Sequence, residues 1–163
     1  MSEQGLNVIR CISTAEILLP SILSYIGSET EIRGRAGGYL CVADKTGHPL
    51  CIAQIGDVPE EKRQQYFRNA IEKANRLGVL SLWVDHRFSR QSRNEQRERW
   101  GGAVRGRHFI WSFSGLPEDG DEMFMAILGA RYDDLTLIDI MTAELTGNIY
   151  FEKLKRLFPV VAF

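Results

Sequence analysis

Helical hydrophobic spacing first occurs near the N-terminus and predicts a helix over residues 13–27. Ser13 and Glu16 have the spacing of a capping box, in which the serine accepts a hydrogen bond from a backbone amide and the glutamate reaches back to the cap. Pro20 should kink or restart this helix, and Gly27 should end it. Its apolar face consists of Ile17, Leu18, Ile22 and Ile26.

Two short apolar runs, at residues 39–43 and 50–55, predict a β-hairpin. The turn between them contains Gly47, which suits the left-handed position of a type I turn with a bulge. This geometry pairs Asp44 with His48 and places Cys41 opposite Cys51. Both faces of the hairpin are apolar, so we expect it to be covered on both sides or to lie at a subunit contact.

The clearest helical pattern predicts a helix that is capped by Asp57 and ends at Gly78. Residues 87–99 are strongly charged and predict a surface helix anchored by Phe88. In the helix predicted between Asp57 and Gly78, the apolar residues recur at 3.6-residue spacing and are Tyr66, Phe67, Ala70, Ile71, Ala74 and Leu77.

A second hairpin is predicted at residues 101–114, with its turn at 105–107 and with Phe109, Trp111 and Phe113 on one face. Helical patterns follow at 117–128, from a cap at 133–134 through Leu145, and at 149–158. Hairpins separated by helices predict an α+β domain with an antiparallel sheet. We expect residues 1–133 to form a ligand-binding domain and residues 134–163 to form a helical extension, packed on the same domain or on a partner subunit.

Composition restricts the protein class. The chain has 163 residues, is 44% hydrophobic and carries a net charge of −1, which fits one globular domain and argues against a nucleic-acid coat or a polybasic membrane binder. No uninterrupted apolar run approaches 18 residues and no signal-peptide pattern begins the chain, so we expect a cytoplasmic protein without membrane contact. Three cysteines without a CxxC motif predict buried thiols and no metal site.

Three segments in order resemble the GlcG/HbpS family, also called the haem-degrading-like or PduO C-terminal-like domain. Residues 42–50 resemble the first hairpin of that family, "V-x-D-x-x-G-x-x-L", and the following helix carries its "A…K…A" pattern. The third segment resembles the family's "GG-x-P…SG-x…D" block, with Val104 in place of the proline. The residues matched in the second and third segments are Ala70, Lys73 and Ala74, then Gly101, Gly102, Ser114, Gly115 and Asp121.

This resemblance covers about residues 13–131 and implies a profilin-like fold, with a five-stranded antiparallel sheet flanked by helices. It also implies a small-ligand-binding domain, haem-binding in some members and usually oligomeric, without one settled reaction. Haem needs an imidazole or similar axial ligand beside an apolar slot. His86 and His108 are the candidate haem ligands because both have aromatic neighbours, while the alternative is that they are surface or structural histidines.

Charge is distributed unevenly along the chain. Residues 85–107 contain seven arginines and three acids, whereas residues 117–144 contain eight acids and one arginine. Arginine side chains bind carboxylates and phosphates in a bidentate manner. Arg87, Arg90 and Arg97 would share one helical face and are the candidate anion-binding residues. The alternatives are a solvated helix paired with the acids or, less in keeping with the absence of an RNA-binding motif, a nucleic-acid contact.

Aromatic and polar residues of the second hairpin suggest further site residues. Trp83 and Trp111 are candidate pocket walls for a flat ligand, and the alternative is that they fill the core. Ser114 and Asp121 belong to the family-like block, although Ser114 also suits a helix cap. Asp121 with His108 would support proton transfer if the two met.

We expect a small-ligand-binding protein, with haem or a small carboxylate as the ligand. An enzyme acting on a small anionic substrate or degrading haem is the second hypothesis, and a non-catalytic scaffold is the third. The apolar residues after position 134 and the apolar ending at 158–163 predict a homodimer or higher oligomer.

Overall fold

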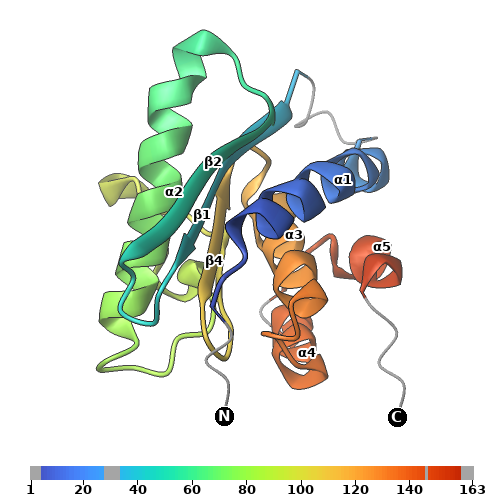
Figure 1. Ribbon diagram of the computed structural model, residues 1–163. Helices are drawn as coiled ribbons and strands as arrows, with labels where there is room; N and C mark the ends of the chain where they lie inside the picture. Colours follow the sequence, from blue (N-terminus) through green and yellow to red (C-terminus); the bar gives the residue numbers. More distant parts are fainter. Residues whose placement is uncertain (1–4, 28–33, 146, 159–163) are drawn as a thin grey trace.

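The computed structural model describes residues 5–27, 34–145 and 147–158. They form an α+β domain in which an antiparallel sheet with strand order β2-β1-β4-β3 lies between helices (Figure 1). The elements in chain order are α1 (Val8–Ile26), β1 (Ala36–Ala43), β2 (Pro49–Asp57), α2 (Glu60–Leu80), the 3-10 helices η2 (Ser89–Ser92) and η3 (Glu95–Arg97), β3 (Ala103–Arg105), β4 (Ile110–Ser114), α3 (Glu118–Arg131), α4 (Leu137–Leu145), α5 (Phe151–Leu154) and the 3-10 helix η4 (Lys155–Leu157). The described ranges thus contain four sheet strands where the family resemblance implies five.

The sheet has helical cover on both faces, as the apolar hairpin predicts. Helix α2 packs on one face, and α1 and α3 pack on the other (Figure 1). Side chains alternate between the two faces of β1: Leu40 and Val42 join the core under α1 and α3, whereas Cys41 and Ala43 pack beneath α2. Strand β1 is consequently buried on both sides.

The register of the first hairpin differs from the prediction. Asp44 pairs with His48 as expected, but Cys41 lies opposite Ile52 and not opposite Cys51. Val42 pairs with Cys51 while Ala43 pairs with Pro49, so Leu50 is an extra residue in β2. Such a bulge reverses the side-chain alternation that follows it. Cys51 therefore faces the α1 side of the sheet, and Cys41 faces the α2 side.

Helix α1 begins earlier than its capping-box pattern predicts. The Asn7 side chain accepts a hydrogen bond from the Arg10 amide at 3.0 Å and caps the helix, so Ser13 lies within it. The buried face already starts at Cys11, which favours the earlier beginning. With 19 residues and a mean hydropathy of 1.3, α1 is long and apolar enough to cross a membrane. The search for uninterrupted apolar runs did not identify this helix as a candidate membrane span. In the structure, α1 packs its buried face into the core.

Helix α2 begins later than its predicted cap at Asp57 and continues past its predicted end at Gly78. It starts at Glu60 after Pro59, and Asp57 belongs to β2. Gly78 does not stop the helix. A Cβ at Gly78 would lie 2.3 Å from the backbone nitrogen of Gly47, so the glycine allows the hairpin turn to pack against the helix.

Residues 87–99 do not form the predicted surface helix. They contain two separate 3-10 helices, η2 and η3, and Glu98 adopts a left-handed conformation with φ of 51°. Phe88 is buried, but no further apolar residue follows it at helical spacing. A short helix without an apolar face gains little from tertiary packing, and here other contacts determine the backbone.

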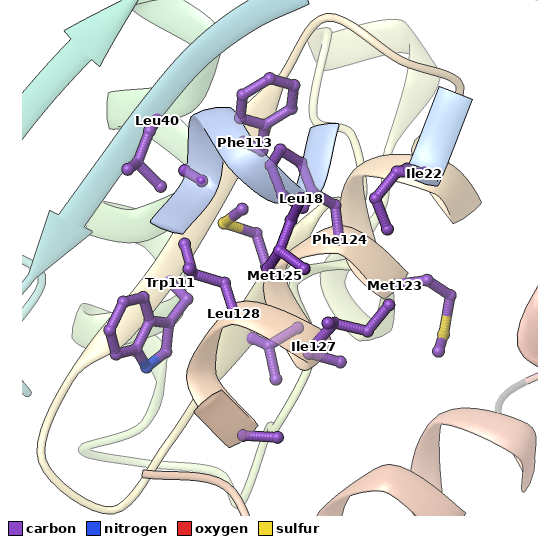
Figure 2. Close-up of a cluster of buried hydrophobic side chains, with 14 of the residues drawn as sticks. Leu18, Ile22, Leu40, Trp111, Phe113, Met123, Phe124, Met125, Ile127 and Leu128 are labelled. Atoms are coloured by element: carbon purple, nitrogen blue, oxygen red, sulfur yellow. The ribbon is translucent and has the colours of Figure 1, made fainter. Parts of the chain in front are cut away.

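The main core lies between the sheet and α3 (Figure 2). Helix α3 is buried on nearly all sides, and its Met123, Phe124 and Leu128 pack with residues of α1 and the sheet. The described part of the C-terminal extension adds Leu135, Ile140, Tyr150, Phe151 and Leu154 to the same core. It therefore covers α1 and α3 within one chain.

Helix α4 is capped by Thr136 and not by the predicted 133–134 pair. Asp139 accepts hydrogen bonds at 2.7 Å from the amide and the hydroxyl of Thr136, and the Asp139 amide donates back to that hydroxyl. Asp134 instead holds the β3–β4 turn. Its carboxylate accepts from the amides of His108 and Phe109 and, at 2.7 Å, from Trp111 Nε1.

Candidate functional site

A pocket of about 860 Å³ opens where α2, the end of β4 and the start of α3 meet. Four residues of α2 with helical spacing form one wall, and the 114–119 segment forms another. The 90–100 loop and residues 149–150 complete it. The lining residues used below are Arg35, Tyr66, Lys73, Arg90, Arg93, Trp100, Ser114, Glu118, Asp119, Asp121, Ile149 and Tyr150.

A buried ion pair lies at the base of this pocket. Lys73 Nζ lies 3.0 Å from Asp121 Oδ2, and both residues are only 2% exposed. Lys73 Nζ also donates to the carbonyl of Phe113 at 2.9 Å, and Asp121 Oδ1 accepts from the amide of Leu116 at 2.8 Å. Burial raises the pKa of Asp121 to about 6, even though the Lys73 charge acts to lower it.

Gly102 makes room for this ion pair. Its φ is +114°, and a Cβ there would lie 2.7 Å from Asp121 Cβ and 2.8 Å from Lys73 Nζ. Any side chain would therefore be strained by the backbone and would displace the pair. Gly102 is the second glycine of the pair that contributed to the family resemblance, and its physical role is to leave room for Lys73 and Asp121.

Arg35 enters the pocket from the start of β1. Its Nη1 donates to the carbonyl of Gly115 at 3.4 Å. A Cβ at Gly115 would lie 2.3 Å from the carbonyl oxygen of Gly37, so the glycine allows the two chain segments to approach closely. Arg35 thereby contacts the residue that follows Ser114, and both Arg35 and the buried Ser114 belong to the pocket lining.

The other arginines of the pocket are held by acids of α3. Arg93 Nε lies 2.9 Å from Glu118 Oε1, and its guanidinium stacks over Trp100. Arg90 pairs with Asp119 and, at 2.8 Å, with Glu122 Oε2. Glu122 is fully buried, which raises its pKa although Arg90 opposes the shift.

Three of the four described cations of the pocket lining lie in ion pairs, and two of these cations each pair with two acids. Lys73 pairs with Asp121, Arg90 with Asp119 and Glu122, and Arg93 with Glu118 and Glu95. Arg35 has no ion pair with any residue in the described ranges. Arg35 thus contributes a guanidinium outside these ion pairs to a lining that also contains Ser114, and the guanidinium and the serine hydroxyl can both donate hydrogen bonds to an anion.

Arg76 of α2 holds the loop that carries Arg90, Arg93 and Trp100. Its Nη1 donates to the Ser89 carbonyl at 2.7 Å, and its Nη2 donates to the Trp100 carbonyl at 2.6 Å. Its Nε lies 2.6 Å from Glu72 Oε1 on the same helix. One guanidinium therefore ties both ends of this irregular loop to α2.

The structure separates the three arginines predicted to form an anion site. Arg90 alone lines the pocket, and acids already hold it. Arg87 pairs with Asp139 at the start of α4, and Arg97 is an exposed residue of η3. Their predicted common face required an α-helix over residues 87–99, which does not form.

Other predicted site residues also occupy separate places. Ser114 and Asp121 line the pocket as expected, whereas Trp111 is buried in the core and Trp83 is 83% exposed outside the pocket. His108 lies in the β3–β4 turn, at the opposite end of β4 from Ser114, so Asp121 meets Lys73 and not His108.

The pocket lining offers no histidine, cysteine or methionine among the described residues, and His86 also lies outside it. Within the same residues, no group of three His, Cys, Asp or Glu side chains is placed to hold a metal ion. The donor set consists of guanidinium, ammonium, hydroxyl, phenol and carboxylate groups. It therefore fits a polar organic ligand, and the phenols of Tyr66 and Tyr150 are the described lining groups of a type that also ligates haem iron.

Sequence reasoning did not identify Arg35, Ile149 or Tyr150 as pocket residues. Arg35 is an isolated arginine before a strand, and residues 149–150 follow the part of the chain that the resemblance covers. Lys73 did carry a signal, because it belongs to the "A…K…A" pattern and shares a helical face with Tyr66 and Asn69.

The fold and the pocket together define an α+β domain with a charged cavity beside its sheet. No match to this chain is found among protein-family models, curated proteins or solved structures.

Proposed function

We propose that this chain is a cytoplasmic small-ligand-binding protein that resembles the GlcG/HbpS family in its profilin-like arrangement, and that its ligand is a small carboxylate. The antiparallel sheet with helices on both faces supports this proposal. So does the meeting of Lys73, Gly102, Ser114 and Asp121, which all come from the segments that carry the resemblance.

The observation that carries the proposal is that the Arg35 guanidinium lines the pocket and forms no ion pair with a described residue. A guanidinium binds a carboxylate through two parallel hydrogen bonds, and the Ser114 hydroxyl can donate a third. The partly buried position of Arg35 reduces competition from water. We favour a carboxylate over haem, because the described lining residues are mostly charged or polar and include no histidine, cysteine or methionine.

Titration calorimetry at pH 7 with acetate and benzoate as probes tests this function. We expect saturable binding by the intact protein and at least tenfold weaker binding by Arg35→Gln. Arg97→Gln is the matched control, because Arg97 is exposed outside the pocket and should bind as the parent does. Absence of binding for both probes, or an Arg35→Gln variant that binds like the parent, would overturn the proposal.

An enzyme acting on a small anionic substrate is the second candidate, and Asp121 favours it. A carboxyl group with a pKa of about 6 in a pocket can exchange protons near neutral pH. Lys73 would keep the carboxylate in place during such a step. Turnover of a carboxylate that disappears in Asp121→Asn, while binding of that carboxylate persists, would establish this function.

We also propose that the protein forms a homo-oligomer. Helix α4 exposes Leu137, Ile138 and Met141 along its length, and neighbouring exposed apolar residues are typical of subunit contacts. Light scattering at micromolar concentration tests the assembly, and a monomeric mass would contradict it. The predicted contact of the apolar ending at 159–163 lies outside the described residues.

A further inference from the structure

Residues 148–150 are fastened to the first turn of α3 beside the pocket. The Asn148 side-chain amide donates to the Asp119 carbonyl at 3.0 Å and to Glu122 Oε1 at 2.9 Å. The side-chain oxygen of Asn148, Oδ1, accepts a hydrogen bond from the backbone amide of Tyr150 at 3.0 Å. Asn148 is buried, so one side chain fixes the direction of the chain on both sides of Ile149.

The same acids also hold the opposite side of the pocket. Arg90, from the 90–100 loop, pairs with Asp119 and Glu122, the two residues that Asn148 contacts. The loop and the C-terminal segment are therefore connected through α3. This arrangement gives Ile149 a defined place in the pocket lining while leaving it 66% exposed.

The pocket consequently combines apolar groups with one guanidinium, that of Arg35, which forms no ion pair with a described residue. Ile149, Tyr66 and Trp100 contribute apolar or aromatic surface to the lining, and the other charged lining groups are already matched. A volume of about 860 Å³ is much larger than a ligand of acetate size requires. A second carboxylate on the ligand would meet no further unmatched cation among the described residues.

We propose that this pocket selects monocarboxylates with an apolar, ring-sized body, and that Ile149 contacts that body. This inference rests on the proposed carboxylate-binding function and names the substrate class of the same site. Asn148 is a positioning residue, which acts by holding Ile149 against the pocket. The burial of apolar ligand surface against Ile149 and its aromatic neighbours supplies the selectivity.

Calorimetry with acetate, benzoate and terephthalate tests the selectivity. We expect benzoate to bind at least tenfold more tightly than either acetate or terephthalate to the intact chain. Ile149→Asp should weaken benzoate binding at least tenfold more than acetate binding, because the added carboxylate repels both anions whereas only benzoate also loses the apolar contact. Ile138→Asp is the matched control, because Ile138 is 76% exposed on α4 and outside the pocket, and it should change neither affinity.

Asn148→Ala separates positioning from general loss of structure. Loss of the Asn148 hydrogen bonds should reduce the ratio of benzoate to acetate affinity about threefold or more. A purely structural defect would instead weaken the binding of both ligands equally. Equal affinities for acetate and benzoate, or unchanged benzoate binding in Ile149→Asp, would overturn this inference and leave carboxylate binding intact. Failure of the proposed function would instead appear as no carboxylate binding, or as indifference to Arg35→Gln.

Discussion

The Lys73 ammonium and the Asp121 carboxylate lie 3.0 Å apart at the base of the pocket, and each side chain has almost no contact with solvent. The two residues come from α2 and α3, which pack on opposite faces of the sheet. Their ion pair thus passes beyond the end of β4 and connects the two helical layers. Removing one member would leave the other charge buried without its partner.

Lys73→Met should destabilise the fold by about 3–5 kcal/mol, because the methionine leaves the Asp121 carboxylate buried and unpaired. Chemical denaturation followed by circular dichroism measures the loss. Lys62→Met is the matched control, because Lys62 is an exposed residue of the same helix, and its stability should change by less than about 0.5 kcal/mol. Equal stabilities for Lys73→Met and the parent would contradict the structural role of the pair.

The Asp121 carboxyl group should titrate near pH 6 in the folded protein, well above its usual pKa of 3.8. The folded state then binds more protons than the unfolded state between about pH 4 and 6. The contribution of Asp121 to the unfolding free energy is therefore present at low pH and decreases as pH rises through this window. Carbon-13 NMR of the carboxyl group measures the midpoint directly, and a midpoint at or below pH 4 would be inconsistent with this environment.

Comparison with Asp121→Asn provides a second measurement of the same effect. Asparagine does not titrate, so the stability of the parent should fall relative to this variant as pH rises from 4 to 6. A difference that stays constant over this range would show that the carboxyl group does not titrate there.

Gly102→Ala should be more destabilising than a glycine substitution that only strains the backbone. A Cβ at Gly102 meets both members of the buried ion pair, whereas one at Gly34, where φ is +81°, meets no atom within 4 Å. We expect Gly34→Ala to cost about 1 kcal/mol and Gly102→Ala to cost several times as much. Thermal unfolding of both variants compares them, and similar losses would mean that the ion pair yields easily to the added methyl group.

Asp134→Ala should loosen the β3–β4 turn. The carboxylate accepts hydrogen bonds from two backbone amides of the turn and from Trp111 Nε1. We expect a loss of about 2–4 kcal/mol, because three buried or partly buried donors lose their acceptor. Amide hydrogen exchange at His108 and Phe109 should accelerate, while exchange in α2 should change no more than global stability requires. Protection of these amides at the parental level would contradict the anchoring role.

The three thiols should be unreactive in the folded protein. Burial raises the pKa of Cys11 and of Cys41 to about 12, and it raises that of Cys51 as well, so little thiolate is present at pH 8. Ellman's reagent should therefore modify the folded protein slowly and all three cysteines rapidly in denaturant. Rapid modification of Cys11 or Cys41 without denaturant would indicate frequent local opening of α1 or β1.

The hairpins and most of the apolar face of α2 could be predicted from sequence because their signals are local, although Phe67 of that predicted face is 38% exposed. Alternation of apolar residues identifies a strand, and Asp44 with Gly47 identifies the first turn. The extra residue at Leu50 could not be predicted in the same way. It follows only from the pairing of Val42 with Cys51 and of Ala43 with Pro49, and it reversed the expected relation between Cys41 and Cys51.

The site was harder to predict because charge pairing is a tertiary property. Arg87, Arg90 and Arg97 are similar in sequence context, yet one pairs with Asp139, one pairs with acids of α3 and one is exposed outside the pocket. Asp121 could be selected from its motif, but its partner Lys73 lies 48 residues earlier in the chain. Arg35 became identifiable only when its lack of a carboxylate partner could be seen.

The dependence of the 89–100 loop on Arg76 limits how this loop could be transplanted. Its Ser89 and Trp100 carbonyls are satisfied by a side chain of α2 and not by the loop's own backbone. Grafted alone onto another scaffold, the loop would lose the donor that joins its two ends and would not retain this shape. A designer who wished to reuse Arg90, Arg93 and Trp100 as a binding surface would need to move the turn of α2 containing Glu72 and Arg76 together with them.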